Sequence, residues 1–231
     1  MEFLTSAWLS ALLAIVLIDL VLAGDNAIVI ALAARNLPAH LQKRAILWGT
    51  FGAIAVRTAM TLGVVWLLKI PGLMAVGGLG LVWIAYKLLA PHSGHTEGHQ
   101  PIAHTFWGAM KTIVIADALM GVDNVLGVAG AAKGSVSLVV IGLLISVPIV
   151  VWGSTLVLKL VERFPIIIYL GAGVLAYTAA HMIVSEPLLD AVFDPSMINR
   201  VATYAVLIVG VLTAGWWTAR RAVTHGPSVT S

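Results

Sequence analysis

The stretch "GVDNVLGVAGAA" at residues 121–132 decides the fold, because it places Asp123 and Asn124 inside a long apolar run. An earlier stretch, "AGDNAIVIALAA" at residues 23–34, places Asp25 and Asn26 in the same setting. A carboxylate in an apolar segment of this length is costly and rare, and it is associated with function more often than with packing.

The composition is that of a membrane protein. Hydrophobic residues make up 60% of the 231 residues, charged residues make up only 10%, and the mean hydropathy is +1.02. These values leave too few polar side chains to cover a soluble globule of this size. The net charge of +3 reflects cations in the loops and indicates no nucleic-acid binding.

Seven apolar stretches are long enough to cross the hydrocarbon layer as helices, which takes about 17 to 25 residues each. A helix satisfies its own backbone hydrogen bonds in lipid, and the alternating ten-residue pattern of a membrane β-barrel is absent from the sequence. We therefore expect an all-α, polytopic membrane protein. The expected helices cover residues 8–34, 46–68, 72–90, 106–132, 136–158, 165–184 and 201–219.

The loop cations predict the orientation, because positively charged residues concentrate on the cytoplasmic side. Most of them share one side if the N-terminus lies outside and the C-terminus inside. The cations on the predicted inner side are Arg35, Lys43, Arg44, Lys87, Lys111, Lys159, Arg163, Arg220 and Arg221. We expect this orientation in the cytoplasmic (inner) membrane of a bacterium.

The chain contains an internal repeat. A shift of 98 residues lays Asp19, Asp25 and Asn26 on Asp117, Asp123 and Asn124, and a shift of 94 aligns the third predicted helix more weakly with the sixth. Since each unit holds three helices, the second unit enters the membrane from the opposite side, which predicts a 3+3 inverted repeat plus one additional helix. Transporters of this design hold their substrate where the two repeats meet.

The repeat divides the chain into four parts. We expect repeat 1 at residues 1–90, a His-rich cytoplasmic linker at 91–105, and repeat 2 at 106–184. An outer loop, the seventh helix and a C-terminal tail follow at 185–231.

The four intramembrane carboxylates need compensation, since each costs about 2.5 to 3.5 kcal/mol on insertion scales. A bound cation, protons, or Arg57 in the second predicted helix can supply it. With every group ionised, four Asp and Arg57 carry a formal charge of −3, which suits a divalent cation with exchangeable protons. Oxygen ligands favour hard ions such as Mn²⁺, Mg²⁺ or Ca²⁺. The candidate metal ligands are Asp19, Asp25, Asn26, Asp117, Asp123 and Asn124.

Helical geometry constrains these ligands. At about 100° per residue, Asp19 and Asn26 share one stripe of a helix, while Asp25 points about 100° to the side. Local breaks at Gly24 and Gly121 would free backbone carbonyls as further ligands. Without such breaks, Asp25 and Asp123 bind the ion, while the outer pair of Asp residues shuttles protons or lines the access path.

Several polar features allow two interpretations. Arg57 is either a structural counter-ion or a participant in ion release, and the intramembrane Asp and Asn residues could merely hydrogen-bond helices together. Met120 is either packing filler or a soft ligand. The linker "PHSGHTEGHQPIAH" at 91–104 is either a solvated connector or a metal-collecting loop, and His181 is expected to be a hydrogen-bonded interfacial residue rather than a ligand.

At "DLVLAGDN" and "DALMGVDN" the sequence resembles the TerC family of bacterial integral membrane proteins, especially its short YjbE/YkoY-like branch. The resemblance covers about residues 8–217. It implies metal-ion transport, with Mn²⁺ efflux the best supported role of such proteins. The family motif carries over onto the six candidate ligands named above.

We therefore expect a secondary transporter that exports a divalent cation, most simply Mn²⁺, by alternating access with proton coupling. We expect no enzymatic activity and no cofactor, with Mn²⁺ as the substrate and the lipid bilayer as the other partner. The alternatives are an intramembrane aspartyl protease, whose chemistry needs two carboxylates sharing a proton, and a cation channel. A retinal-type photoreceptor is excluded, because residues 201–219 contain no lysine.

Overall fold

The computed structural model describes residues 5–67, 69–90, 105–132 and 135–224, and every regular element in these ranges is helical. Side chains at a few helical positions, Asp123 among them, lie outside the description. The elements are α1 (Ser6–Ala34), α2 (Ala39–Leu62), α3 (Val64–Leu67), α4 (Leu73–Leu89), α5 (Phe106–Ala132), α6 (Val136–Arg163), α7 (Ile166–Val184), η2 (Pro187–Leu189), α8 (Asp190–Phe193) and α9 (Met197–Thr224).

The protein is an all-α polytopic membrane protein. Among the described residues, four helices are long and apolar enough to cross a membrane individually, and α1 makes a fifth candidate if its two inclined parts form one span. The four are α2, α6, α7 and α9 up to Arg220. The remaining predicted segments coincide with α4, a shorter apolar helix, and α5. The expectation of seven spans stays a prediction.

The second predicted helix differs most from the observed element. It was expected at residues 46–68, whereas α2 begins at Ala39, directly after Pro38, and ends before Gly63. The apolar pattern misses the polar first turns of α2, to which Lys43 and Arg44 belong. At the other end, the Gly63 N–H donates to the Ala59 carbonyl and the chain starts a separate short helix, α3.

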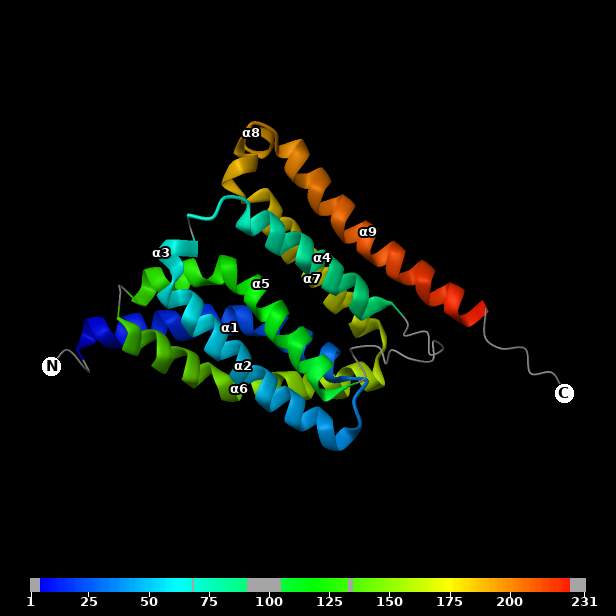
Figure 1. Cartoon of the computed structure of the whole chain (residues 1–231), viewed down its shortest axis with the longest axis horizontal. Helices are drawn as coiled ribbons and strands as arrows, with labels where there is room; N and C mark the ends of the chain where they lie inside the picture. The colour runs from blue at the N-terminus through cyan, green and yellow to red at the C-terminus, as the bar shows by residue number, and fades with distance from the viewer. Residues whose placement is uncertain (1–4, 68, 91–104, 133–134, 225–231) are drawn as a thin grey trace.

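The helices pack in pairs that are far apart in sequence. In Figure 1, α1 lies against α6, α2 against α5, and α4 against α7, while α9 covers the outer flank of α4 and α7. The direction of the ribbons shows that α1 and α6 run one way and that α2 and α5 run the other way (Figure 1).

Glycines allow two of these pairs to approach closely. A Cβ atom added at Gly142 of α6 would lie 2.5 Å from Ile15 Cγ2 of α1, and one added at Gly49 of α2 would lie 2.7 Å from Ile113 Cδ1 of α5. Small residues are the usual solution for tight helix packing in membranes, where lipid removes the hydrophobic drive between helices. The four helices of these two pairs, α1, α2, α5 and α6, are thus held together by the same type of contact.

The segment between α7 and α9 is tied to α4 by Glu186. Its buried carboxylate accepts hydrogen bonds from the backbone N–H groups of Gly72 at 3.0 Å, Met74 at 3.1 Å and Ala75 at 3.3 Å. Desolvation acts to raise the pKa of Glu186, but these N–H groups and that of Leu188 together hold the pKa below its usual value of 4.5. Glu186 therefore caps the N-terminus of α4 as an ionised group.

Candidate functional site

The structure brings three of the predicted ligands together at the centre of the helix pairs. Asp19 and Asn26 project from α1 and Asp117 projects from α5, and their exposed fractions are only 3%, 5% and 8%. Polar side chains this deeply buried need partners, because an unpaired buried charge is strongly destabilising.

Arg57 of α2 is the partner of both carboxylates. Its Nη1 donates to Asp19 Oδ1 at 2.5 Å, and its Nη2 donates to Asp117 Oδ1. The planar guanidinium fork presents two N–H groups in a fixed geometry, so one side chain can hold two carboxylates from different helices. Arg57 is thus the counter-ion of both carboxylates, and whether it also takes part in ion release stays a prediction.

Three polar atoms at this cluster have no hydrogen-bond partner among the described residues: Asn26 Oδ1, Asp117 Oδ2 and Arg57 Nε. They belong to residues that line a cavity of about 20 Å³, which is enough for a single water molecule or ion. Two of the three unpaired atoms are oxygens and therefore acceptors. The other residues of the lining are Asp19, Ile30, Thr50, Ala53, Ile54, Ser146 and Val150.

Thr50 of α2 and Ser146 of α6 were not predicted. Both are buried at 1% exposure, and each hydroxyl donates to a carbonyl of its own helix, Thr50 to Ile46 and Ser146 to Leu143. Their oxygens keep lone pairs that can accept a hydrogen bond or coordinate a cation. In the sequence each is only a small polar residue within an apolar segment. Such residues are common in membrane helices, so the pattern could not identify Thr50 and Ser146.

The remaining predicted ligands lie elsewhere or outside the description. Asp25 is half-buried, does not line the cavity, and accepts a hydrogen bond from the Asn26 backbone N–H at 2.9 Å. It lies within electrostatic range of Arg57 and Asp117. Asn124 is also half-buried and away from the cavity, and the side chain of Asp123 is not described.

Helical geometry explains this division. Asp19 and Asn26 share a stripe of α1 and both face the cavity, as their spacing predicts, while Asp25 is turned aside. A bend of 45° separates residues Trp8–Leu20 from Gly24–Ala34 in α1, close to the predicted break at Gly24. In α5 the helix continues through Gly121, so the alternative of a local break at this position does not hold.

The donor set suits a hard cation, although it is sparse. Two carboxylates and one amide oxygen surround the cavity, and oxygen ligands of this kind bind Mg²⁺, Ca²⁺ or Mn²⁺. Within the described ranges, no three His, Asp or Glu side chains are grouped closely enough to form a metal site by themselves. A cation at this position would therefore share the carboxylates with Arg57.

The other polar features discussed above do not belong to this cluster. Met120 is fully buried in the apolar core and does not line the cavity, which supports its role as packing filler. His181 of α7 lies with its Nδ1 3.0 Å from Tyr204 Oη of α9, so the expected hydrogen-bonded role is confirmed. The His-rich linker at 91–104 lies outside the described residues.

Comparison with known proteins gives consistent results. The chain matches the family described as "Integral membrane protein TerC family" over residues 4–222. It is 48% identical over 179 residues to the uncharacterized membrane protein YjbE of Bacillus subtilis, covering 78% of this chain and 81% of that protein.

Two more distant relatives are similar to this chain over most of their length. The uncharacterized membrane protein YkoY of Bacillus subtilis is 25% identical over 236 residues, covering 89% of this chain and 71% of that protein. The inner membrane protein YgdQ of Escherichia coli is 26% identical over 176 residues, covering 69% of this chain and 73% of that protein. No solved structure matches the chain. The extent of the family match and the identity to YjbE show that this chain belongs to the TerC family of integral membrane proteins.

Proposed function

We propose that this protein is a secondary transporter that exports a divalent metal cation, with Mn²⁺ as the leading candidate, by alternating access coupled to protons. The observation that carries the proposal is the buried cluster of Asp19, Asn26 and Asp117, whose oxygens meet at an internal cavity and are only partly neutralised by Arg57. Acceptor oxygens without a protein partner in the interior need a polar guest, and a cation fits two carboxylates that share one counter-ion.

The packing supports an inverted repeat of two three-helix units, α1, α2 and α4 against α5, α6 and α7. Under this relation α1 corresponds to α5 and α2 to α6, so the pair α1–α6 corresponds to α5–α2, and both pairs are present (Figure 1). Ile15 and Ile113, which are 98 residues apart, contact Gly142 and Gly49 in the two pairs. The cavity lies where the units meet, as in transporters built from such repeats.

Arg57 gives the site a release mechanism. A cation that enters the cavity competes with the guanidinium for Asp19 and Asp117, and Arg57 neutralises both carboxylates again when the ion leaves. With every group ionised, Asp19, Asp117 and Arg57 at the cavity carry a formal charge of −1, and Asp25, which does not line the cavity but lies within electrostatic range of Arg57 and Asp117, brings the total to −2. This charge matches one divalent cation, and protonation of a carboxylate would drive release on the acidic side of the membrane.

We infer that the protein spans the bacterial cytoplasmic membrane seven times, with the N-terminus outside. The loop cations support this orientation, and the printed name of the relative YgdQ, an inner membrane protein, supports the location. Export is the direction that the family resemblance favours.

The test is metal uptake by purified protein in proteoliposomes that contain a fluorescent Mn²⁺ indicator. We expect Asp19→Asn, Asp117→Asn and Asn26→Ala to reduce the rate by at least about tenfold, as loss of metal-site groups does elsewhere. The same substitutions at Asp25 and Asp123 separate ion ligands from proton carriers, because a variant of a proton carrier loses its response to a pH gradient while it still binds metal.

Asp190→Asn is the matched control, because it removes the same charge from an exposed position of α8. Its rate should equal that of the wild type. Wild-type rates in the Asp19 and Asp117 variants would overturn the proposed site. Large unitary currents in planar bilayers would replace alternating access with the channel alternative.

A further inference from the structure

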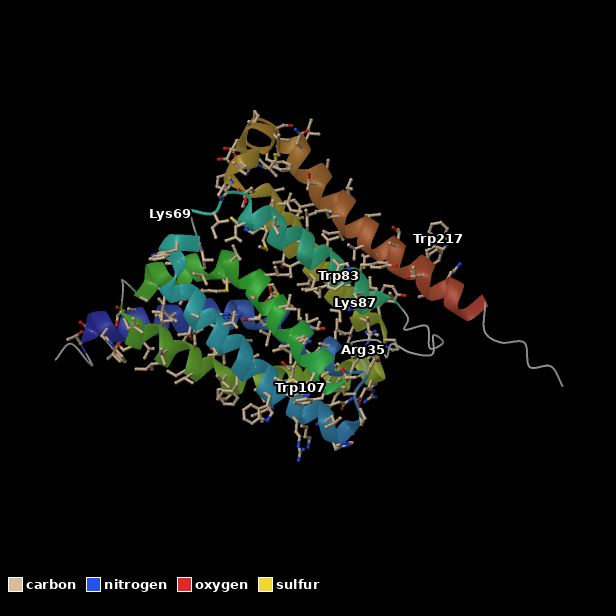
Figure 2. The ribbon with its side chains drawn as sticks, in the orientation of Figure 1. Arg35, Lys69, Trp83, Lys87, Trp107 and Trp217 are labelled. Carbon is tan, nitrogen blue, oxygen red and sulfur yellow. The ribbon has the colours of Figure 1, made fainter. Side chains whose placement is uncertain are left out.

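A second cavity lies at the end of the helices where the predicted cytoplasmic cations gather. It measures about 130 Å³ and is bounded by the C-terminal end of α1, the second half of α4 and the first half of α5. In Figure 2, Arg35, Trp83 and Lys87 follow one another along this end of the molecule. The lining consists of Leu32, Ala33, Arg35, Asn36, Trp83, Ile84, Lys87, Leu88, Lys111, Thr112 and Ile115.

Among the residues that the structure describes, three cations and no acidic residue line this cavity. Arg35, Lys87 and Lys111 come from three different helices, and none of them forms an ion pair within the described ranges. Lys87 lies over the ring of Trp83 with its Nζ 4.7 Å from the ring centroid, so its charge stays at the cavity wall. Three cations in one wall repel one another unless an anion lies between them.

Arg35 gives a second, independent indication of an anionic ligand. Its Nη2 donates to the Leu88 carbonyl at 2.8 Å, which holds the side chain in place between α1 and α4. Its Nη1 is buried and has no hydrogen-bond partner among the described residues. A buried charged donor without an acceptor is costly, so the position calls for an anionic oxygen.

Apart from Asn36 and Thr112, the rest of the wall is apolar and reaches the outer surface of the helices. Leu32, Ile84 and Leu88 form its inner part, while Trp83 and Ile115 are 59% and 50% exposed on the outer surface. A free phosphate ion makes no favourable contact with an apolar surface and loses part of its hydration shell beside it. A phospholipid satisfies both parts, because its phosphate meets the cations and its acyl chain covers the apolar side chains.

We propose that this cavity binds an anionic phospholipid. The phosphate accepts hydrogen bonds from Arg35 and Lys87 and neutralises Lys111, and the adjoining acyl chain lies against Trp83 and Ile115. Basic pockets between membrane helices on the cytoplasmic side are known to hold such headgroups. The lipid would link α1, α4 and α5, of which α1 and α5 also carry the buried carboxylates, and this inference stands independently of the metal that the protein transports.

The experiment is native mass spectrometry of the full chain in detergent, titrated with dioleoyl-phosphatidylglycerol or with zwitterionic dioleoyl-phosphatidylcholine. We expect one phosphatidylglycerol molecule to bind in preference to phosphatidylcholine. Lys111→Gln and the double variant Arg35→Gln/Lys87→Gln should weaken that binding by about fivefold for each cation removed. Thermal unfolding in detergent should show stabilisation by phosphatidylglycerol in the wild type and a smaller shift in both variants.

Lys43→Gln is the matched control, because Lys43 is an exposed cation on the same predicted side that does not line the cavity. It should bind phosphatidylglycerol like the wild type. Lys111 is exposed, so this variant keeps the test valid if the Arg35 variant does not fold. The proposal fails if Lys111→Gln binds as the wild type does, if Lys43→Gln weakens binding equally, or if inorganic phosphate or glycerol phosphate stabilises the protein as well as the lipid does.

Discussion

At the scale of single residues, Arg57 decides whether the buried acids can coexist. It forms hydrogen bonds with Asp19 and Asp117 from two different helices, and its side chain is itself 6% exposed. A buried pair of this kind adds little net stability, yet removal of one partner leaves uncompensated charge in the interior. Removal of Arg57 should therefore cost more stability than the loss of two hydrogen bonds alone.

We predict that Arg57→Gln lowers the stability of the protein in detergent by about 3 to 5 kcal/mol, because two buried carboxylates lose their counter-ion. Thermal unfolding followed by size-exclusion chromatography measures the change. Addition of Asp19→Asn and Asp117→Asn to the same chain should restore most of the lost stability, since no unpaired charge remains.

Arg200→Gln serves as the control for Arg57. Arg200 pairs with Asp194 on the exposed surface, where an ion pair contributes about 0 to 1 kcal/mol. Equal losses in Arg57→Gln and Arg200→Gln would contradict the assigned role of the buried cluster.

Glu186 makes the stability of the contact between α4 and the segment after α7 depend on pH. Its pKa is lower in the folded protein than its usual value of 4.5, so the ionised form stabilises the fold above pH 4.5. This contribution disappears as the pH falls below 4.5 and through the folded pKa.

We predict that Glu186→Gln costs about 1 to 2 kcal/mol near neutral pH, because the N-terminus of α4 loses a charged cap. Unfolding temperatures of the two proteins should converge in acidic buffer, where the wild-type carboxyl is protonated as well. A difference that stays constant over the whole pH range would show that the charge of Glu186 does not matter.

At the scale of helices, the close contacts at Gly49 and Gly142 hold the pairs α2–α5 and α1–α6 together. A methyl group at either position would overlap Ile113 or Ile15, at 2.7 Å and 2.5 Å. A β-branched side chain has few rotamers with which to move away from such an overlap.

We predict that Gly49→Ala and Gly142→Ala each destabilise the protein by about 1 to 3 kcal/mol through overpacking. Gly173→Ala is the control, because a Cβ at Gly173 of α7 meets nothing within 4 Å. That variant should be neutral or slightly stabilising, as alanine is the better helix former. Unfolding temperatures of the three variants in one detergent would decide, and equal values would argue against the tight pairs.

At the scale of the whole molecule, orientation in the membrane is open to a direct test, because the chain contains no cysteine. We predict that a membrane-impermeant maleimide labels Asp190→Cys in intact cells, since the loop around α8 lies outside in the proposed topology. Lys43→Cys should react only after the cells are permeabilised. Both positions are exposed, so the reverse pattern would place the C-terminus outside.

The sequence by itself determined the class of the fold and singled out three of the polar side chains that the structure brings together. Apolar length and composition predict membrane helices, because a backbone in lipid must satisfy its own hydrogen bonds. The 98-residue repeat identified Asp19, Asn26 and Asp117 among its matched polar residues, because carboxylates are rare inside membrane helices and two matching sets of them stand out. Helical periodicity also placed Asp19 and Asn26 on one stripe.

Only the tertiary structure decided which of these side chains meet. The pairing of α1 with α6 and of α2 with α5 brings Arg57 between Asp19 and Asp117, adds Thr50 and Ser146 to the cavity, and leaves Asp25 to one side. It also gathers Arg35, Lys87 and Lys111 around one apolar cavity, although they are distant in sequence. Periodicity gives the direction of a side chain about its own helix, whereas the identity of its neighbours depends on packing between helices, which no local pattern encodes.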